Sequence, residues 1–404
     1  MNGPLSDIRV VEIASFVAVP AAGALLADLG AEVIKVEVPG GETLRHSTPR
    51  RMGYRGCEVP ESPHFHMDNR GKRSLELDLT KTSARTALHK VIRRADIVLT
   101  NLLPKRLAKF GLDAATLRAD QPELIVAALN GYGNRGPEAD TPAFDYTAYW
   151  ARTGLMDTLR DAGEKPAFLR PGVGDHAAAL ALVSGVLAAL RERDRTQVGQ
   201  EVAVNLMHMG FYIAGNDVSL VATSDQEVQR HDSSGPRNPL WAHYRTGDDR
   251  WIFLVMIDSQ RYWPAVCAAL ERPELEVDER FHNEVGRYRN SPELTSILDG
   301  IFASRSLEEW EAHLTAQPII WSPVRTLHEA THDPQVAEMN VITTVDHPEH
   351  DGIRTVTPPV QLSNHAMPGT RPAPALGADS NAILEEAGCT TDEIATVLEG
   401  AGGR

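Results

Sequence analysis

Cysteine is scarce in this sequence. Its 404 residues contain only Cys57, Cys267 and Cys389, which lie far apart and include no C-x-x-C pair. Secreted domains that depend on disulfides need a denser framework, so that class is excluded. The first residues, Met1 to Asp7, also lack the basic and apolar segments of a secretory signal. We therefore expect a cytoplasmic protein.

Basic residues are outnumbered by acidic ones. Lys and Arg total 40 against 55 for Asp and Glu, so the formal net charge is −15. Nucleic acids and anionic membranes attract basic surfaces, and we expect neither as a partner. Long apolar runs are missing too. The longest, Ala177 to Leu190, is shorter than the roughly 20 residues that span a bilayer, so we expect no membrane span.

A glycine-rich loop is also missing after the first predicted strand. That loop, Ala14 to Pro20, lacks the G-x-G-x-x-G that lets a backbone approach a dinucleotide, and G-x-x-x-x-G-K-[ST] occurs nowhere in the chain. Nicotinamide chemistry and P-loop hydrolysis are therefore disfavoured.

What is present is an alternation of strand and helix signals. β-Branched runs predict strands over 8–13, 32–38, 96–99 and 124–128, with helices over 20–29, 82–94 and 177–191. The last helix is so apolar that we expect it to be buried on most sides. This order predicts an α/β fold whose parallel sheet is covered on both faces. Such sheets bind ligands at the carboxyl ends of their strands.

The second half of the chain predicts a smaller domain. Residues 228–250 are rich in Gly, Pro, Asn and Asp and predict irregular structure, whereas 251–257 predicts a strand and 261–270 a helix. We expect an extended stretch over 368–374, followed by two short helices near 381–386 and 391–398. We divide the chain into a large domain (1–225), a small domain (226–325) and a return to the large domain (326–404).

One segment fits a zinc-peptidase pattern. His328 and His332 match H-E-x-x-H, in which two His side chains share one helix face. Pro334 follows closely, and a proline disfavours helical geometry in the residue before it. No third ligand is obvious, although His347 and His350 lie downstream. We interpret the segment as the end of a surface helix and predict no metal.

Basic residues gather in two places despite the acidic total. One cluster covers 69–73 and precedes a strand-like stretch over 74–79, and the other comprises Lys105, Arg106 and Lys109 after the strand at 96–99. A single cluster is more often a solvated face. Two clusters beside strands of one sheet favour an anion site there.

Asp175 comes directly before the most apolar predicted helix and after the stretch Pro171 to Gly174. An Asp in this place can be an N-cap, which accepts a hydrogen bond from an early backbone N–H. The same environment keeps a carboxylate ionised, as a carboxylate nucleophile requires. Both interpretations stay open. We expect no pairing of Asp175 with His176, because adjacent helix residues do not face each other.

Together these segments resemble the family III CoA-transferases, the group of formyl-CoA transferase, carnitine CoA-transferase and α-methylacyl-CoA racemase. The resemblance covers nearly the whole chain in the right order, over 10–12, 30–37, 69–74, 131–137, 174–176 and 195–200. The segments 144–149 and 174–176 look closest to members that act on phenyllactate-type and other hydroxy- or aryl-carboxylic acids. The resemblance implies a Rossmann-like large domain, a small inserted domain and an interlocked homodimer.

The resemblance also implies the mechanism. Asp175 would attack the acyl-CoA thioester to give an acyl–aspartyl anhydride, and the CoA thiolate would convert this anhydride to an aspartyl-CoA thioester. The acceptor acid would then reverse the steps. No metal or permanently bound cofactor is implied, since acyl-CoA and a small carboxylic acid are substrates.

The resemblance further implies which residues contact CoA. These are Phe16, Val17 and Ala18 in the first loop, Asn69, Arg70 and Lys72 along the CoA chain, Asn101, Leu102 and Lys109 near its phosphates, and Asn130 and Tyr132 by the thioester. Lys109 stands where relatives often carry Arg, so it keeps the charge but loses the bidentate geometry.

Two departures bear on the reaction. Racemases of the family carry a His directly before the residue that here is Asp145, and Phe144 cannot transfer a proton. Formyl-type enzymes carry a glycine run over the intermediate, where this chain has only Ser233-Ser234-Gly235-Pro236. We therefore expect CoA transfer to a larger acid. The alternatives are an acyl-CoA racemase or isomerase of the same fold, and a CoA-binding protein that keeps Asp175 only as a helix cap.

Overall fold

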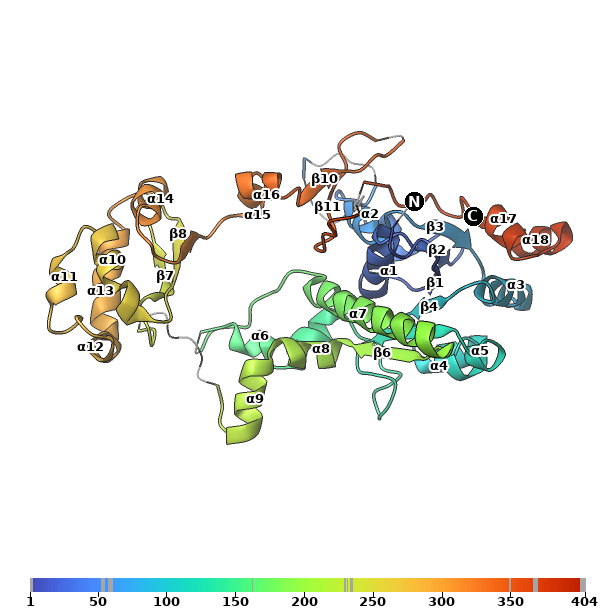
Figure 1. Cartoon of the computed structure of the whole chain (residues 1–404), viewed down its shortest axis with the longest axis horizontal. Coiled ribbons are helices and arrows are strands. Elements are labelled where there is room, and N and C mark those ends of the chain that lie inside the picture. The colour runs from blue at the N-terminus through green and yellow to red at the C-terminus, as the bar shows by residue number, and fades with distance from the viewer. Residues whose placement is uncertain are drawn as a thin grey trace. The chain divides into compact units, whose positions relative to one another are not determined.

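The computed structural model describes residues 3–51, 55–56, 61–161, 163–228, 230, 232, 235–348, 350–365 and 370–399. Cys57, Ser233, Ser234 and part of the stretch 368–374 lie outside these residues. The chain forms two compact units (Figure 1). Unit 1 comprises Met1–Met156, Phe168–Gln226 and Pro334–Arg404, and unit 2 comprises Asp157–Ala167 and Glu227–Asp333.

Unit 1 is built on a six-stranded parallel sheet in the order β3-β2-β1-β4-β5-β6, which confirms the predicted sheet. The strands are β1 (Arg9–Ile13), β2 (Glu32–Glu37), β3 (Arg73–Glu76), β4 (Ile97–Thr100), β5 (Ile125–Asn130) and β6 (Glu201–Asn205). Val10 of β1 pairs with Val33 of β2 on one side and with Ile97 of β4 on the other. The chain thus leaves β1 and β4 in opposite directions, and a ligand crevice is expected where this switch occurs.

Helices cover both faces of this sheet, as predicted. One face packs on α1 (Ala18–Asp28) and α7 (Val173–Thr196), with Val10, Leu99 and Ile125 in the shared core. The other face packs on α3 (Thr82–Ile92), α17 (Ser380–Glu386) and α18 (Thr391–Leu398), with Val11, Val36 and Val98 in the core. Figure 1 shows the last two helices beside α3, so the end of the chain returns to the sheet.

The helix α7 is longer and more exposed than predicted. It has 24 residues because it begins at Val173, before the predicted start, and because the polar segment 192–196 continues the helix that the apolar run began. Ala178, Leu182 and Val186 are buried, whereas Leu180 and Leu187 are exposed. Only 44% of its most apolar 18-residue stretch is buried, so the predicted burial on most sides is wrong. By length and composition α7 could cross a membrane, a test that the core helix of a soluble protein also passes, so the expectation of no membrane span stays a prediction.

Unit 2 contains a three-stranded antiparallel sheet covered by helices. Its strands are β7 (Trp241–Arg245), β8 (Trp251–Val255) and β9 (Trp321–Pro323), and its main helices are α10 (Ser259–Ala269), α13 (Ser291–Phe302) and α14 (Leu307–Thr315). The predicted irregular structure over 228–250 is wrong at β7. There Ala242 and Tyr244 are buried and alternate with exposed neighbours, which is the period of a strand with one buried face.

The remaining elements are short. In unit 1 they are η1 (Thr43–His46), α2 (Pro63–Asn69), α4 (Pro104–Phe110), α5 (Ala114–Asp120), η2 (Tyr146–Ala151), α8 (Leu206–Ile213), α9 (Gly215–Ser224), α16 (Pro334–Glu338), β10 (Ile342–Thr344) and β11 (Arg354–Val356). In unit 2 they are α11 (Glu274–Val277), α12 (Glu284–Arg289) and α15 (Leu327–Ala330), and α6 (Leu155–Thr158) lies where the units divide.

The segment that resembles a zinc-peptidase pattern is a surface helix end, as predicted. The helix α15 ends at Ala330, and Glu329 completes a capping box with Thr326 at its start. Glu329 also pairs with Arg250 at 2.8 Å. His328 and His332 are both exposed. The carboxylate of the pattern therefore stabilises the helix start.

Candidate active site

The loop between β1 and α1, from Ala14 to Val17, is fixed by the strands beside it. Asn101, directly after β4, donates from its amide to the Ser15 carbonyl at 2.7 Å and accepts from the Ser15 N–H at 3.3 Å. Lys35 of β2, which is buried, donates to the Ala14 carbonyl at 3.3 Å. The loop is therefore held at the switch point, at the carboxyl end of the sheet.

Phe16 in this loop has a left-handed backbone, with φ of 65°, which is costly for any residue other than glycine. Its N–H donates to Oε2 of Glu42 at 2.6 Å, and Oε1 of Glu42 pairs with Lys35 at 2.7 Å. Lys35 also pairs with Glu12 of β1 at 3.1 Å. A buried chain of ion pairs thus stabilises the strained residue, whose side chain remains 38% exposed.

The start of α7 is capped by a side chain from another element. The N-cap position is Gly172, which has φ of 80° and no side chain to accept a hydrogen bond. Asp145, directly before η2, accepts the N–H of Gly174 at 3.3 Å. Asp175 is the third residue of the helix, so its interpretation as the N-cap is wrong. The glycine at 172 starts the helix earlier than the sequence suggests.

Two glycines bring this turn close to its neighbours. A Cβ on Gly172 would lie 3.7 Å from Cγ1 of Val17 in the β1–α1 loop. A Cβ on Gly174 would lie 2.6 Å from the ring of Tyr149 in η2, closer than real Cβ atoms come. The turn that carries Asp175 therefore packs between the first loop and η2.

Asp175 is half-buried and has two other carboxylates as neighbours. Burial and the charges of Asp145 and Asp68 raise the pKa of Asp175 to about 7, and the charge of His176 opposes this rise. The expectation that this environment keeps the carboxylate ionised is therefore wrong, since Asp175 is only partly ionised at neutral pH. A carboxylate with little hydration is more nucleophilic once it ionises.

His176 bridges α7 and α2. Its Nε2 lies 3.0 Å from Oδ1 of Asp68, whose side chain is buried. The backbone N–H of His176 donates to the Gly172 carbonyl at 2.9 Å. The carboxylate of Asp68, with the charge of Asp175, raises the pKa of His176, although burial opposes the rise.

Asn69, Arg70 and Lys72 are buried and engaged within the chain. Four acceptors surround Lys72 Nζ at 2.7–2.9 Å and share its three N–H groups, namely Glu12 Oε2, Pro20 O, Asp68 O and Asn69 Oδ1. Arg70 donates to Asp28 at 2.6 and 2.9 Å and to Met67 O. Asn69 donates to Phe65 O at 3.1 Å. These side chains join α1, α2 and β1, and their contact with CoA stays a prediction.

The other predicted CoA contacts follow β1, β4 and β5. Val17 and Ala18 lie at the start of α1, the latter buried. Asn101 and Leu102 follow β4, and Lys109 is exposed in the last turn of α4. Asn130 ends β5 and orders the turn after it, accepting from Gly133 N–H and donating to Asn134, both at 2.6 Å. Tyr132 lies in that turn, and the guanidinium carbon of Arg152 is 5.8 Å from the centre of the Tyr132 ring. Their roles stay predictions.

Exposed aromatic side chains flank the Asp175 turn. Phe144, 56% exposed, meets Phe16 edge-on with ring centres 5.2 Å apart. Tyr146 stacks on Phe168 at 5.6 Å and donates to the Leu169 carbonyl at 3.2 Å. Phe144 and Tyr146 stand on either side of Asp145 in the chain. Aromatic rings therefore lie next to Asp145, which caps the turn that carries Asp175.

Several groups that build this site have no role predicted from the sequence. They are Glu12, Lys35, Glu42, Asp68 and Asp145. Glu12 and Lys35 interrupt runs of β-branched residues, and a charge in a buried strand indicates a buried partner. The contact of Asp145 with Gly174 spans 29 positions and leaves no such local signal.

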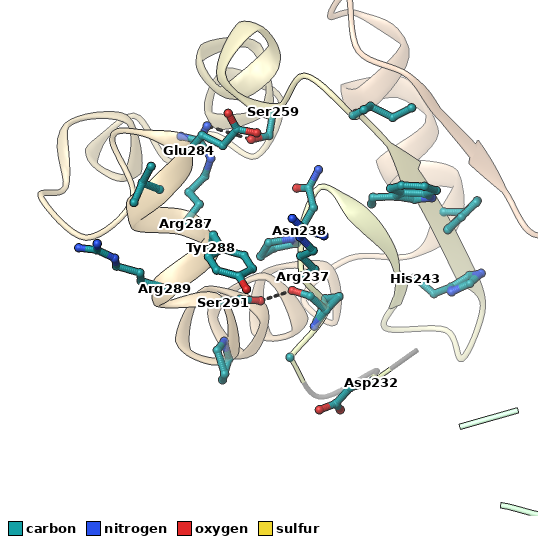
Figure 2. A pocket seen from close by; sticks show the side chains of 18 of the residues that line it. Asp232, Arg237, Asn238, His243, Ser259, Glu284, Arg287, Tyr288, Arg289 and Ser291 are labelled. Atoms are coloured by element: carbon teal, nitrogen blue, oxygen red, sulfur yellow. Dashed lines mark hydrogen bonds between the residues drawn. The ribbon is translucent and has the colours of Figure 1, made fainter. Parts of the chain in front are cut away.

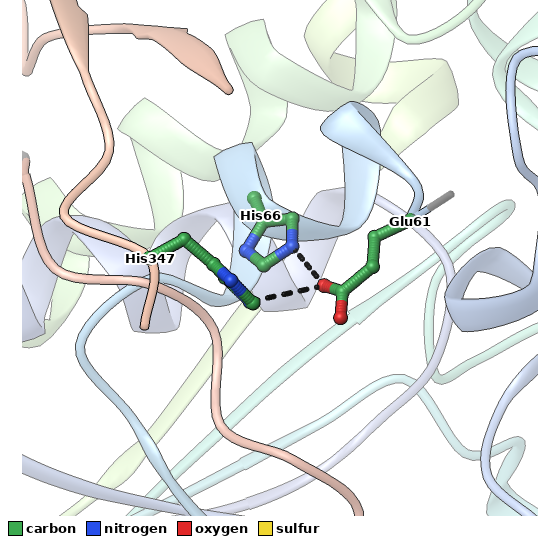
Figure 3. A group of neighbouring side chains, drawn as sticks. All are labelled: Glu61, His66 and His347. Carbon is green, nitrogen blue, oxygen red and sulfur yellow. Dashed lines mark hydrogen bonds and ion pairs between the residues drawn. The ribbon is translucent and has the colours of Figure 1, made fainter. Parts of the chain in front are cut away.

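A second cluster, in unit 1, contains ligand types that metals prefer. Within the described residues, Glu61, His66 and His347 are the one group of this kind (Figure 3). Glu61 Oε2 lies 2.5 Å from His66 Nε2 and 3.3 Å from His347 Nε2. However, His66 Nδ1 accepts the N–H of Ala373 at 3.1 Å, so its proton belongs on Nε2, facing Glu61. A metal-bound His donates from its second nitrogen, so this geometry favours a shared proton.

Unit 2 holds a cavity of about 1270 Å³ that contains none of the predicted site residues. Figure 2 shows Arg237, Tyr288 and Arg287 among its lining side chains. Arg237 lies 5.8 Å from the Tyr288 ring centre. Arg287 is buried and donates to Phe281 O, Ser259 Oγ and Gln260 Oε1. Its described hydrogen bonds therefore fix local structure in unit 2.

Comparisons with known proteins identify the family of the chain. The profile of CoA-transferase family III matches residues 5–380. Cinnamoyl-CoA:phenyllactate CoA-transferase of Clostridium sporogenes is 31% identical, over 96% of this chain and 94% of the other. (R)-2-hydroxy-4-methylpentanoate CoA-transferase of Clostridioides difficile is 29% identical, over 96% and 97%. The crystal structure of Rv3272 from M. tuberculosis, 29% identical, superposes with a TM-score of 0.81 over 94% and 99%. The predicted family is thereby confirmed, and the chain belongs to CoA-transferase family III.

Proposed function

We propose that Asp175 is the nucleophile that carries CoA between an acyl-CoA donor and a free carboxylic acid. The observation that supports this role best is the placement of Asp175. It is a half-buried carboxylate in the first turn of α7, packed beside the loop at the switch point and not used as a helix cap.

Each step of the proposed cycle forms one bond and breaks another. The Asp175 carboxylate attacks the thioester carbonyl, forming an acyl–aspartyl anhydride and releasing the CoA thiolate. The thiolate attacks the aspartyl carbonyl, forming aspartyl-CoA and releasing the donor acid as a carboxylate. The acceptor carboxylate attacks the aspartyl thioester carbonyl, forming a second anhydride and releasing the CoA thiolate. This thiolate attacks the acyl carbonyl of the anhydride, which forms the new acyl-CoA and frees Asp175 as a carboxylate. Neither oxidant nor net proton transfer is required.

Coenzyme A would lie along the carboxyl end of the sheet. We assign the pantetheine arm to the loop of Phe16 and Val17, and the phosphates to the segment after β4, where Lys105, Arg106 and Lys109 are exposed. Backbone N–H groups at the start of α1 would stabilise the oxyanions. The side chains of Asn69, Arg70 and Lys72 already donate hydrogen bonds within the chain. We therefore propose that they chiefly fix the elements around the β1–α1 loop.

We propose aryl or branched 2-hydroxy acids as the acid substrates. Two relatives are named for phenyllactate and for 2-hydroxy-4-methylpentanoate. The exposed rings of Phe16, Phe144 and Phe168 near the Asp175 turn suit an apolar acyl group. CoA and acyl-CoA are substrates in this proposal, and no permanently bound cofactor takes part.

The racemase alternative lacks one of its two proton-transfer groups, because Phe144 stands where racemases of the family carry a His. Phe144 precedes Asp145, and its ring packs on Phe16. A racemase would need a second acid or base on the opposite face of the substrate. Incubation with acyl-CoA alone separates the two activities, because a transferase needs an acceptor acid and a racemase does not.

We further propose that unit 2 is the small domain inserted into the Rossmann-like domain, and that two copies form an interlocked homodimer. Exposed apolar side chains on α7 to α9, including Leu180, Leu187, Tyr212 and Leu220, support burial against a second copy. A cytoplasmic location without membrane attachment belongs to the same proposal.

A substrate screen tests the function. Acetyl-, succinyl- and aryl-acyl-CoA donors are mixed with a panel of acids, and products are identified by mass spectrometry. We expect new acyl-CoA only when donor, acceptor and Asp175 are all present. The Asp175→Asn variant is the matched control, since Asn preserves the shape but is a far weaker nucleophile. Wild-type turnover in this variant would overturn the role of Asp175.

A further inference from the structure

His176 is held against a buried carboxylate. Its Nε2 lies 3.0 Å from Oδ1 of Asp68. A carboxylate at hydrogen-bond distance favours the protonated, positively charged form of an imidazole. The pair therefore favours the imidazolium form, although the ring is next to the nucleophile and partly removed from water.

The charges around Asp175 are otherwise negative. Asp145 faces it from the start of η2 and Asp68 from α2, and both side chains are buried. Tyr149 of η2 packs on the same turn and is neutral at physiological pH, since its pKa is raised. His176 is the cation that acts on Asp175 within this set. Two buried carboxylates beside a third disfavour its ionisation unless a positive charge offsets them.

We propose that His176, held as an imidazolium by Asp68, is a positioning residue that supplies the positive charge on which ionised Asp175 depends. The inference rests on the proposed role of Asp175 in CoA transfer. The imidazolium contributes twice in the cycle. It stabilises the free carboxylate before attack on the donor, and it stabilises Asp175 as the leaving group when the thiolate takes the acyl group from the second anhydride.

The pairing also fixes the place of the nucleophile. Asp68 belongs to α2, whose Asp68 carbonyl and Asn69 side chain accept from Lys72. Lys72 is in turn paired with Glu12 in β1. The first turn of α7 is thereby connected through His176 to a buried network in the sheet. Loss of the pair is expected to affect both the ionisation and the placement of Asp175, and these two effects separate experimentally.

The test compares a neutral and a cationic substitute at position 176. His176→Gln keeps a hydrogen-bonding side chain without charge, and His176→Lys keeps the charge without the ring. The pH profile of kcat/KM is measured from pH 5.5 to 9.5 for both variants and for His282→Gln, an exposed histidine of unit 2. We expect the acidic limb of His176→Gln to move up by about one pH unit. His176→Lys and the control are expected to keep the wild-type limb.

The position of the limb distinguishes the proposed role from a merely structural one. A structural defect lowers activity at every pH and is not restored by lysine, and either result overturns the proposal. In the favourable case His176→Gln loses about tenfold at pH 6 and approaches wild-type activity at pH 9, where Asp175 is ionised in both enzymes.

A second measurement does not depend on turnover. The imidazole of His176, assigned by its absence from the spectrum of His176→Gln, is titrated by NMR in the substrate-free enzyme. We expect it to titrate above the usual histidine range in the wild type and lower in Asp68→Asn. Titration at or below about 6.5 in the wild type would overturn the proposal. If no acyl-CoA is turned over but His176 still titrates high, the proposed function fails while the pairing stands.

Discussion

The carboxylate of Asp145 accepts the N–H of Gly174 at 3.3 Å, and this contact caps α7 from outside the helix. Because Asp145 caps the helix, the carboxylate of Asp175, which follows Gly174 in the chain, is not used as the cap. A helix start normally favours an ionised acid. Here the capping carboxylate itself disfavours a second negative charge close by, and burial adds to the effect. The protein thus has a nucleophile that is partly protonated at neutral pH.

The pH dependence of transfer follows from this arrangement. Only ionised Asp175 attacks a thioester, and its pKa is raised to about 7, so kcat/KM should rise with pH and level off above neutrality. One pH unit below the pKa the rate should be about tenfold lower than the plateau. Asp145→Asn retains an oxygen that can accept from Gly174 but removes the charge. The acidic limb of its kcat/KM profile should therefore move to lower pH. An unchanged limb in that variant would contradict the coupling.

Gly174→Ala should disturb the Asp175 turn. The added Cβ would lie 2.6 Å from the ring of Tyr149, so the helix start or the ring must move. We expect at least a tenfold loss of kcat and a loss of about 1–3 kcal/mol in the free energy of unfolding. Gly300→Ala in α13 meets open space and should leave turnover unchanged. Equal turnover of the two variants would show that the close packing at Gly174 is irrelevant.

Lys72 and Lys109 should respond differently to substitution. Lys72→Met leaves Glu12 buried with one fewer cation, so unfolding by urea should show a loss of about 3–5 kcal/mol. Lys109→Ala removes an exposed charge, so stability should hold while KM for acyl-CoA rises several-fold, most strongly at low salt. Lys165→Ala, exposed in unit 2, is the control. A raised KM with unchanged stability in Lys72→Met would reverse the assignment.

Phe144 should affect the choice of acid. Its ring is 56% exposed beside Phe16 and offers apolar contact to a bulky acyl group. Phe144→Ala should lower kcat/KM for phenyllactate about tenfold relative to acetate, as expected for a lost aromatic contact of about 1.4 kcal/mol. Tyr288→Ala in unit 2, with 55% exposure, is the matched control. If both acids lose equally, Phe144 has no part in specificity.

The sheet could be predicted from the sequence because its strands are local β-branched runs, as in β1, β2, β4 and β5. The short strand β7 was missed because its alternation stands among glycines, prolines and asparagines, which indicated a loop. Asp175 could be identified as a site candidate from the glycine turn and the apolar helix beside it.

The environment of Asp175 could not be predicted in the same way. Its pKa depends on Asp68 and Asp145, which lie far away in the sequence and meet it only in the folded chain. The buried partners of Arg70 and Lys72 also come from other elements, so a basic stretch was taken for a ligand surface. Charges in the middle of strands, such as Glu12 and Lys35, were the available sign of this network.

The most direct test of the account is the detection of an activated carboxyl group on Asp175. The enzyme is incubated with an acyl-CoA that it turns over, treated with hydroxylamine and digested, and its peptides are analysed by mass spectrometry. The account predicts a hydroxamate at Asp175 that appears only with acyl-CoA and is lost in Asp175→Asn. Turnover without any hydroxamate, or a hydroxamate at Asp145 instead, would contradict it.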